Sequence, residues 1–199
     1  MVFDILRAAG RDGDVSAFVD VEGKVPEGTT VFDRPVISGM AALDDRLRED
    51  DFTLVLGHGN NSRRKALMAW LEERNARTST AVHPSAIISP DVEIGTCTTI
   101  SAGAVVLTGS TLGKGVIVNT SATVDHDCRV GDFAQLAPGC NLAGRVTVGP
   151  ESFVGIGAVV IQNTTVGEGC VVGASAAVVR DAPAHTLVIG VPARVRKHL

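Results

Sequence analysis

The chain has 199 residues and a formal net charge of −4 at pH 7; 45% of its residues are hydrophobic and 20% are charged. No run of 18 or more apolar residues occurs, so the composition is typical of a globular protein and excludes a membrane-spanning helix. Lysine and arginine are scattered except for a short C-terminal cluster (Arg194, Arg196, Lys197), which argues against a nucleic-acid partner.

Residues 1–80 alternate between helical and strand patterns. The first residues lack the basic segment, the apolar core and the cleavage site of a signal peptide, which predicts a cytoplasmic location. Periodicity predicts helices over residues 2–9, 40–48 and about 62–75, and strands over 15–21 and 52–56, the second one buried. This alternation predicts a small parallel α/β domain that ends near residues 78–84.

Residues 81–199 follow a repeat of six residues, without convincing helical periodicity until the last few residues. Sixteen positions in steps of six all carry Ile, Val or Leu: Ile88, Ile94, Ile100, Val106, Leu112, Val118, Val124, Val130, Leu136, Leu142, Val148, Val154, Val160, Val166, Val172 and Val178. Small residues mostly stand two positions earlier, and glycine often follows the aliphatic residue. A period this short predicts a solenoid of short strands whose aliphatic side chains point inward and stack between coils.

The cysteines form no C-x-x-C pair and lack the histidine spacing of a zinc site. They are Cys97, Cys128, Cys140 and Cys170. The last three fall in the small inward slots of the repeat, so we interpret the cysteines as reduced and structural.

His126 is the one histidine inside the regular repeat. The others lie outside it: His58, His83, His185 and His198. His126 stands two residues after an inward aliphatic residue, which predicts a position on a corner or outer face, where a neighbouring subunit can meet it. Asp125 and Asp127 flank it, and a carboxylate can orient an imidazole and raise its basicity. The alternative is a surface histidine without a chemical role.

A single histidine can support acyl transfer from a thioester to an amine or hydroxyl. The reaction needs a base for the acceptor's proton and a donor for the tetrahedral oxyanion. An imidazole with an ordinary pKa of about 6.5 and a backbone N–H group supply both, without a metal or a covalent nucleophile. Cys128 is an alternative nucleophile, but its inward slot predicts that it is buried.

The repeat resembles that of the hexapeptide-repeat acyltransferases, whose left-handed parallel β-helix has three hexapeptides in each coil. The resemblance implies about five coils. Four segments are similar to the nucleotide-sugar acetyltransferases, including the bacillosamine-pathway and perosamine N-acetyltransferases and the sialic acid O-acetyltransferases. These are NTSATVDHDCRVGD (119–132), AGRVTVG (143–149), FVGIGAVV (153–160) and IGVPARV (189–195). The expected fold class is therefore mixed, with a small α/β domain (1–80) followed by a left-handed β-helix domain and tail (81–199).

The resemblance implies a role for several residues of the repeat. His126 is expected to be the general base and Asp127 its partner, while Asn119 is expected near the acceptor. The backbone N–H at Gly144 is expected to meet the thioester carbonyl.

The resemblance also implies acetyl-CoA as co-substrate, bound between adjacent β-helices of a homotrimer. Backbone groups of Ile156 and Ala174 are expected to line its site, with its phosphates near the C-terminal tail. Gln135 replaces a histidine that contacts the cofactor in some relatives, and its amide can still form a hydrogen bond. No metal is expected.

On the acceptor side, relatives begin with a strand and a Gly-rich loop, whereas this sequence starts at the following helix. We therefore expect a Rossmann-like domain without its first strand, through a misplaced start codon, a shortened chain or divergence. Asp20 is similar to an acid that contacts the ribose or base, and Gly59 and Asn60 are similar to part of a G-N-N-x-x-R turn. Asp20 can instead simply end a strand, and the turn can simply begin a helix. His58 is interpreted as a loop residue and His83 as a junction residue.

The resemblance favours N-acetylation of a nucleotide-linked amino sugar, of the UDP-4-amino-sugar or GDP-perosamine type, for cell-surface polysaccharide biosynthesis. One alternative is O-acetylation of sialic acid or a related sugar. A γ-type carbonic anhydrase needs three histidines from adjacent coils and subunits, and the repeat contains one. A non-catalytic scaffold is the third alternative, against which the DHD motif and the VPAR tail argue.

Overall fold

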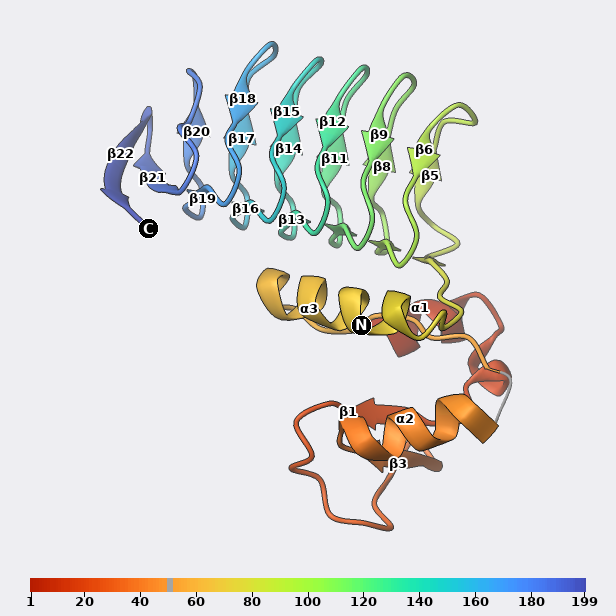
Figure 1. The fold of residues 1–199 in the computed structure, drawn as a ribbon. Helices are drawn as coiled ribbons and strands as arrows, with labels where there is room; N and C mark the ends of the chain where they lie inside the picture. The colour runs from red at the N-terminus through yellow and green to blue at the C-terminus, as the bar shows by residue number, and fades with distance from the viewer. Residues whose placement is uncertain (50–51) are drawn as a thin grey trace.

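The computed structural model describes residues 1–49 and 52–199, and most of the chain from residue 81 onward forms a left-handed parallel β-helix (Figure 1). Its three faces are parallel sheets. The first face contains β4 (Ala81–Val82), β7 (Thr99–Ile100), β10 (Ile117–Val118), β13 (Gln135–Leu136), β16 (Phe153–Val154) and β19 (Val171–Val172). The second contains β5 (Ile87–Ile88), β8 (Val105–Val106), β11 (Thr123–Val124), β14 (Asn141–Leu142), β17 (Val159–Val160) and β20 (Ala177–Val178). The third contains β6 (Glu93–Ile94), β9 (Thr111–Leu112), β12 (Arg129–Val130), β15 (Thr147–Val148) and β18 (Thr165–Val166).

The sixteen aliphatic residues of the repeat confirm the prediction, because each is the second residue of one of the strands β5 to β20. Each strand from β4 to β17 pairs in register with the strand 18 residues further on, as Ile100 does with Val118 and Val118 with Leu136. From Ile100 to Val178 these side chains are at most 3% exposed. Burial of this continuous apolar column is the main driving force for the β-helix.

The corners of the β-helix contain a backbone feature that the sequence pattern did not predict. The third residue after the inward aliphatic residue has a positive φ at every corner from Cys97 to Ser175, whether it is glycine or not. Asp127, with φ of 59°, is one of the non-glycine cases. We name the corners by the faces that they join: the first corner joins the first and second faces, the second joins the second and third, and the third joins the third and first.

The cysteines are free and buried, in agreement with the sequence interpretation. Cys128, Cys140 and Cys170 are fully buried in the core of the β-helix. Burial raises the pKa of the Cys140 thiol to about 12. These residues therefore pack the core as small apolar groups.

The N-terminal part matches the sequence prediction only in its helices and first strand. It contains α1 (Val2–Ala8), a 3-10 turn η1 (Asp12–Asp14), β1 (Phe18–Asp20), β2 (Thr30–Val31), β3 (Arg34–Ser38), α2 (Met40–Glu49) and α3 (Asn61–Glu73). The sheet order is β1-β3-β2, with β1 and β3 parallel and β2 and β3 antiparallel. The strand predicted over 52–56 is wrong: only Leu54 forms an isolated bridge, to Thr78, because the described chain places no strand beside this segment. Its apolar residues pack instead, as Leu56 does in the cluster under α3.

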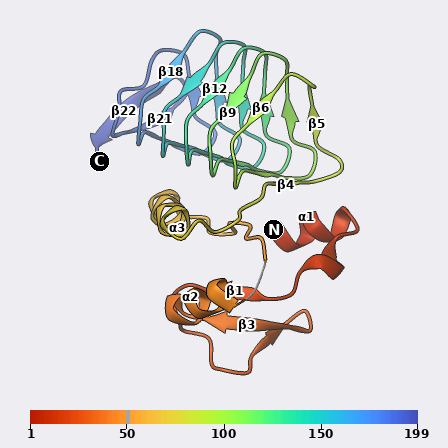
Figure 2. The same ribbon diagram turned by 45° about the vertical axis from the view of Figure 1, so that its right-hand side comes forward.

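Helix α3 lies along the third corner of the β-helix, on the side of β13 and β16 in Figure 1, and it also lies beneath the β-helix in Figure 2. Met68 and Leu71 of α3 pack with Phe133 and Cys97 of that corner. The contact is therefore a second hydrophobic cluster, outside the coils.

Arg64 of α3 is fully buried in this contact and links the helix to the β-helix through hydrogen bonds. Its guanidinium donates to the backbone oxygens of Gly115 (2.6 Å) and Phe133 (2.8 Å) on two successive coils, and to that of His58 (3.0 Å). It also donates to the side-chain oxygen of Asn61 at 3.1 Å. Burial lowers the pKa of Arg64 to about 10. A buried guanidinium is tolerated here because carbonyl and amide oxygens surround it.

The chain ends in an antiparallel hairpin that extends the first face, formed by β21 (Thr186–Gly190) and β22 (Ala193–His198). The last residues are thus a strand and not a helix, since edge pairing with β21 outweighs their weak helical periodicity. No helix among residues 1–49 and 52–199 is both long and apolar enough to cross a membrane.

Candidate active site

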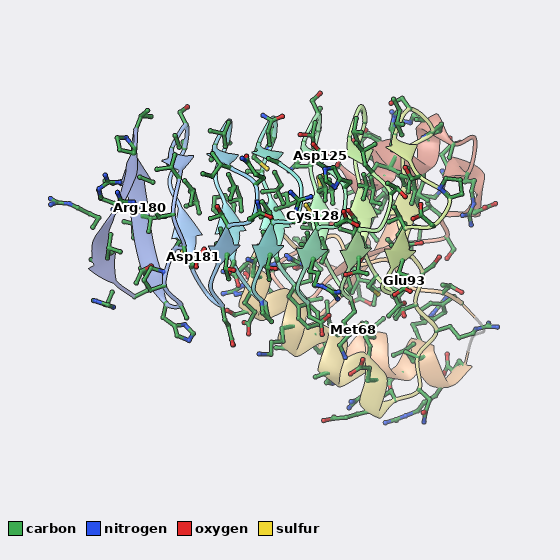
Figure 3. The ribbon with its side chains drawn as sticks, turned by 90° about the horizontal axis from the view of Figure 1, so that it is seen from above. Met68, Glu93, Asp125, Cys128, Arg180 and Asp181 are labelled. Carbon is green, nitrogen blue, oxygen red and sulfur yellow. The ribbon has the colours of Figure 1, made fainter. Side chains whose placement is uncertain are left out.

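His126 lies in the second corner, in the turn between β11 and β12. The Asp125 carboxylate accepts a hydrogen bond from the backbone N–H of His126 at 2.7 Å, and Asp127 takes the left-handed conformation. These two features turn the chain so that the side chains of His126 and Asp127 lie next to each other on the outer edge. In Figure 3, which looks down on this corner, Asp125 and Cys128 mark the ends of the turn near the middle of the β-helix.

The side chains of His126 and Asp127 form a hydrogen-bonded pair, with 2.8 Å between Nδ1 of the imidazole and Oδ2 of the carboxylate. They are 42% and 58% exposed, so solvent and ligands reach both. When Nδ1 carries the proton and donates to the carboxylate, Nε2 has a free lone pair. This is the arrangement that a general base oriented by an acid requires.

Two glycines make room for the pair. A Cβ atom added to Gly144, one coil further on, would lie 2.5 Å from Nε2 of His126. A Cβ atom added to Gly109, one coil earlier, would lie 2.5 Å from Oδ1 of Asp127. Gly144 was among the residues expected at the site, whereas Gly109 was missed because a glycine in this repeat is common and carries no distinguishing signal.

A pattern of open backbone donors links three of the expected cofactor residues. Gly144, Ile156 and Ala174 each stand two residues after an inward aliphatic residue, the same repeat position as His126. Within residues 1–49 and 52–199, none of their backbone N–H groups donates a hydrogen bond. These N–H groups are therefore available to a ligand.

Several residues expected to contact the cofactor or the acceptor lie elsewhere on the β-helix. Asn119, Ile156 and Ala174 belong to the first corner, and Gln135 begins strand β13 on the first face. Ile156 is 59% exposed, and the side-chain oxygen of Asn119 accepts the N–H of Thr120 at 2.8 Å. A single chain thus brings His126, Asp127 and Gly144 together at the second corner. Asn119, Ile156 and Ala174 of the same chain lie at the first corner.

Three of the four residues expected to bind the acceptor, Asp20, Gly59 and Asn60, belong to the N-terminal part, which lies below the β-helix in Figure 1. The Asp20 carboxylate accepts the N–H groups of Glu22, Lys24 and Val25, at 3.1, 2.6 and 2.9 Å, and so organises the loop after β1. Asn60 caps α3, because its side-chain oxygen accepts the N–H of Arg63 at 2.9 Å. Gly59 is exposed, and an added Cβ atom would meet no neighbour. Their binding roles remain predictions.

Cys128 is fully buried beneath the turn, and its thiol donates to the backbone oxygen of Ala143 at 3.2 Å. Burial raises the pKa of this thiol, which opposes formation of a thiolate. No three His, Cys, Asp or Glu side chains gather as metal ligands within the described part of the chain.

A left-handed β-helix with an exposed histidine–carboxylate pair beside an open backbone donor defines the class of hexapeptide-repeat acyltransferases. Comparison with known proteins bears this out. A histidine-to-asparagine variant of perosamine N-acetyltransferase from Caulobacter crescentus, solved with CoA and GDP-perosamine, has a TM-score of 0.92 at 37% identity, covering 98% of this chain and 90% of that one. The acetyltransferase domain of PglB from Neisseria gonorrhoeae, solved with acetyl coenzyme A, has a TM-score of 0.89 at 37% identity, covering 98% and 92%.

Among curated proteins, a 2,3,4,5-tetrahydropyridine-2,6-dicarboxylate N-acetyltransferase of Enterococcus faecalis is 40% identical over 149 residues, or 70% of this chain. That match spans 62% of the Enterococcus protein's own length, and the match to a second curated relative spans 56% of that relative's length. No family model matches the chain. The chain belongs to the hexapeptide-repeat acetyltransferase family that includes perosamine N-acetyltransferase and the acetyltransferase domain of PglB.

Proposed function

We propose that the chain is an acetyl-CoA-dependent N-acetyltransferase that acts on the amino group of a nucleotide-linked amino sugar. The observation that carries the proposal is the position of the His126 Nε2 atom against Gly144, with Asp127 bound to the opposite ring nitrogen. The likeness to a perosamine N-acetyltransferase solved with GDP-perosamine supports an amino sugar of the GDP-perosamine or UDP-4-amino-sugar type.

Acetyl-CoA, when bound, supplies an acetyl thioester as the electrophile. His126 accepts at Nε2 the proton that the attacking amine loses as the new C–N bond forms, and Asp127 stabilises the resulting imidazolium. The N–H of Gly144 donates to the carbonyl oxygen as negative charge develops there. When the C–S bond breaks, the imidazolium returns its proton to the departing thiolate.

Acetyl-CoA is proposed to lie along the open N–H groups of Ile156 and Ala174, with Gln135 as a further hydrogen-bonding contact. Asp20, Gly59, Asn60 and Asn119 are proposed to contact the acceptor. On this basis residues 1–80 form an acceptor-binding domain and residues 81–199 the acetyltransferase domain. We place the enzyme in the cytoplasm, in the biosynthesis of a cell-surface polysaccharide.

We further propose a homotrimer in which the second corner of one subunit faces the first corner of the next. Two observations support it: the two sets of expected site residues occupy different corners of one chain, and exposed apolar side chains gather near the first corner and second face. These are Ile156, Val159, Ile161 and Val179. Apolar surface of this kind is stabilised when a second copy covers it.

The activity is tested by measuring release of the CoA thiol with a panel of acceptors. GDP-perosamine and a UDP-linked 4-amino sugar are compared with sialic acid and with tetrahydropyridine dicarboxylate. We expect turnover with a nucleotide-linked amino sugar, and a fall of roughly 100-fold or more in His126→Ala, the range of general base catalysis. His83→Ala, which removes a histidine at the first coil, is the matched control and is expected to keep the wild-type rate. Turnover of sialic acid alone, or an unaltered rate in His126→Ala, contradicts the proposal.

The shared site is tested by co-expressing His126→Ala with Asn119→Ala. If the site spans two subunits, mixed trimers contain interfaces with both wild-type residues, and about a quarter of the wild-type activity is expected from random assembly. If both residues served one site within a single chain, mixing would restore nothing. Light scattering provides the independent measurement, with an expected mass of three times the 20.6 kDa of the chain.

A further inference from the structure

Ser110 lies inside the β-helix, one coil before the turn that carries His126, and its side chain is fully buried. Its hydroxyl donates to the backbone oxygen of Asp125 at 2.8 Å and accepts the N–H of Cys128 at 3.1 Å. Asp125 and Cys128 are the two ends of the turn. One hydroxyl therefore ties together the residues on either side of His126 and Asp127.

The position of Ser110 in the repeat is usually filled by alanine or cysteine, whose side chains need no hydrogen-bond partner. A buried hydroxyl costs free energy unless it is hydrogen-bonded. Here it is bonded as both donor and acceptor, so the serine is compatible with the core and closes the turn from the inside.

The outer side of the same coil also supports the pair. The backbone oxygen of Thr108 accepts the N–H of Asp127 at 2.9 Å, and Gly109 lies against the Asp127 carboxylate. Asp91, another coil earlier, accepts hydrogen bonds from the Thr108 hydroxyl (2.7 Å) and the Gly109 N–H (2.8 Å). The Thr108 hydroxyl bond lowers the pKa of Asp91, which keeps the carboxylate ionised and able to accept both. The two preceding coils thus hold the His126 turn.

We propose that Ser110 is a positioning residue for the acetyl transfer, with Asp91 as its support on the outer side. The inference rests on the proposed function, because it assigns Ser110 the task of holding the proposed base against Gly144. Without the hydroxyl, the ends of the turn are no longer tied, and the His126 ring can leave the place that faces Gly144. The expected loss is in the rate of the chemical step and not in the binding of either substrate.

Two other buried hydroxyl residues of the β-helix, Ser152 and Thr98, serve as controls for this role. Ser152 is fully buried, donates to Gly167 O at 2.6 Å and accepts Cys170 N–H at 3.2 Å, so it closes a turn of the third corner in the same way. The Thr98 hydroxyl closes another turn of that corner in the same way, because it donates to a backbone oxygen at 2.9 Å and accepts a backbone N–H at 3.3 Å. The turn that Ser152 closes contains no histidine, and Thr98 demonstrates that threonine fits this slot.

The test compares Ser110→Ala, Ser152→Ala and Ser110→Thr by thermal unfolding and by steady-state kinetics with both substrates. Each alanine variant loses the hydrogen bonds of the buried hydroxyl to a carbonyl oxygen and an N–H group of the next coil, so we expect similar falls in Tm. Only Ser110→Ala is expected to lower kcat, by at least fivefold and with both KM values within twofold of wild type. Ser110→Thr is expected to recover at least half of the wild-type kcat. Equal kcat values in Ser110→Ala and Ser152→Ala would overturn the proposal.

If Ser110→Ala does not accumulate as folded protein, Asp91→Ala is compared with Asp181→Ala in the same assays. Asp181 also reaches across coils at the second corner, where it accepts the N–H of Thr165 at 2.8 Å, but it lies far from His126 along the axis. A lower kcat in Asp91→Ala alone supports the proposal, and equal rates reject it. An active His126→Ala variant would reject the proposed function itself, whereas an inactive one together with fully active Ser110→Ala would reject only the role of Ser110.

Discussion

The imidazole of His126 occupies the space that a side chain at position 144 would fill. An added Cβ atom on Gly144 would lie 2.5 Å from Nε2 and 2.6 Å from Cε1 of the ring. The two residues are 18 positions apart and stack because their coils pair in register, with the N–H of Arg145 bound to the backbone oxygen of His126 at 2.9 Å. The regularity of the fold thus places Nε2 of His126 beside Gly144.

Gly144→Ala is expected to abolish most of the activity while the protein stays folded. The new methyl group displaces the ring, and a displaced side chain at an exposed corner costs little stability. We expect turnover to fall by about 100-fold or more, the cost of misplacing a reacting group by about an ångström. Turnover and thermal unfolding are measured together. Gly13→Ala, at a site where a Cβ atom meets no neighbour, is the control and should change neither.

Asp127→Asn is expected to lower kcat by roughly 10- to 100-fold, less than for a buried triad acid because the carboxylate is largely exposed to water. The amide keeps the size of the side chain but removes the charge that stabilises the imidazolium. Both KM values are expected to stay within about twofold, since the change acts in the transition state. A variant with the wild-type kcat would exclude Asp127 as the partner of the base.

Arg64→Met is expected to destabilise the contact between α3 and the β-helix by about 3–5 kcal/mol, because it removes the donors on which buried carbonyl oxygens depend. Trp70, the single tryptophan, lies on α3 and reports this contact by fluorescence during urea unfolding. The matched control is Arg63→Met, whose exposed side chain pairs with Glu22 on the surface. We expect it to change stability by less than about 1 kcal/mol. Similar losses in the two variants would contradict the assigned role of Arg64.

Stability is expected to fall as the pH rises from about 9 towards 12, partly through Cys140. The ordinary pKa of the thiol is 9.0 and burial raises it to about 12, so between these values the unfolded chain loses a proton that the folded chain retains. The contribution is complete below pH 9 and is lost on approach to the folded pKa. Cys140→Ala should therefore show a shallower decline of the free energy of unfolding in urea titrations across this range. An identical slope in both proteins would contradict the assignment.

The β-helix could be predicted from the sequence almost residue by residue, because one apolar position in six directly determines which side chains point inward. The N-terminal part could not. Strands β2 and β3 were missed, and the buried segment at 52–56 forms one bridge instead of a strand. These elements are short, and neighbouring elements decide whether they pair, so local pattern gives little information about them.

Like the fold, the candidate site was only partly predictable from the sequence. His126 and Asp127 are conspicuous by residue type, and the structure joins their side chains by a hydrogen bond. Ser110 and Gly109 look like ordinary repeat residues, and only the stacking of coils gives them a place beside the pair. Arg64 lies in the segment predicted as a helix, and its burial against two coils could not be inferred from a charged residue among other charged residues.

The in-register pairing of strands 18 residues apart makes the coil the smallest length that the β-helix can gain or lose. A one-residue insertion within a strand would turn the inward side chains outward. Duplication of a whole coil, such as residues 146–163, would instead add about 4.8 Å between His126 and the C-terminal hairpin and leave both unaltered. The number of coils therefore fixes the distance from the histidine to the hairpin, and with it the length of any molecule that spans the two. Evolution or design can change this distance only by whole coils.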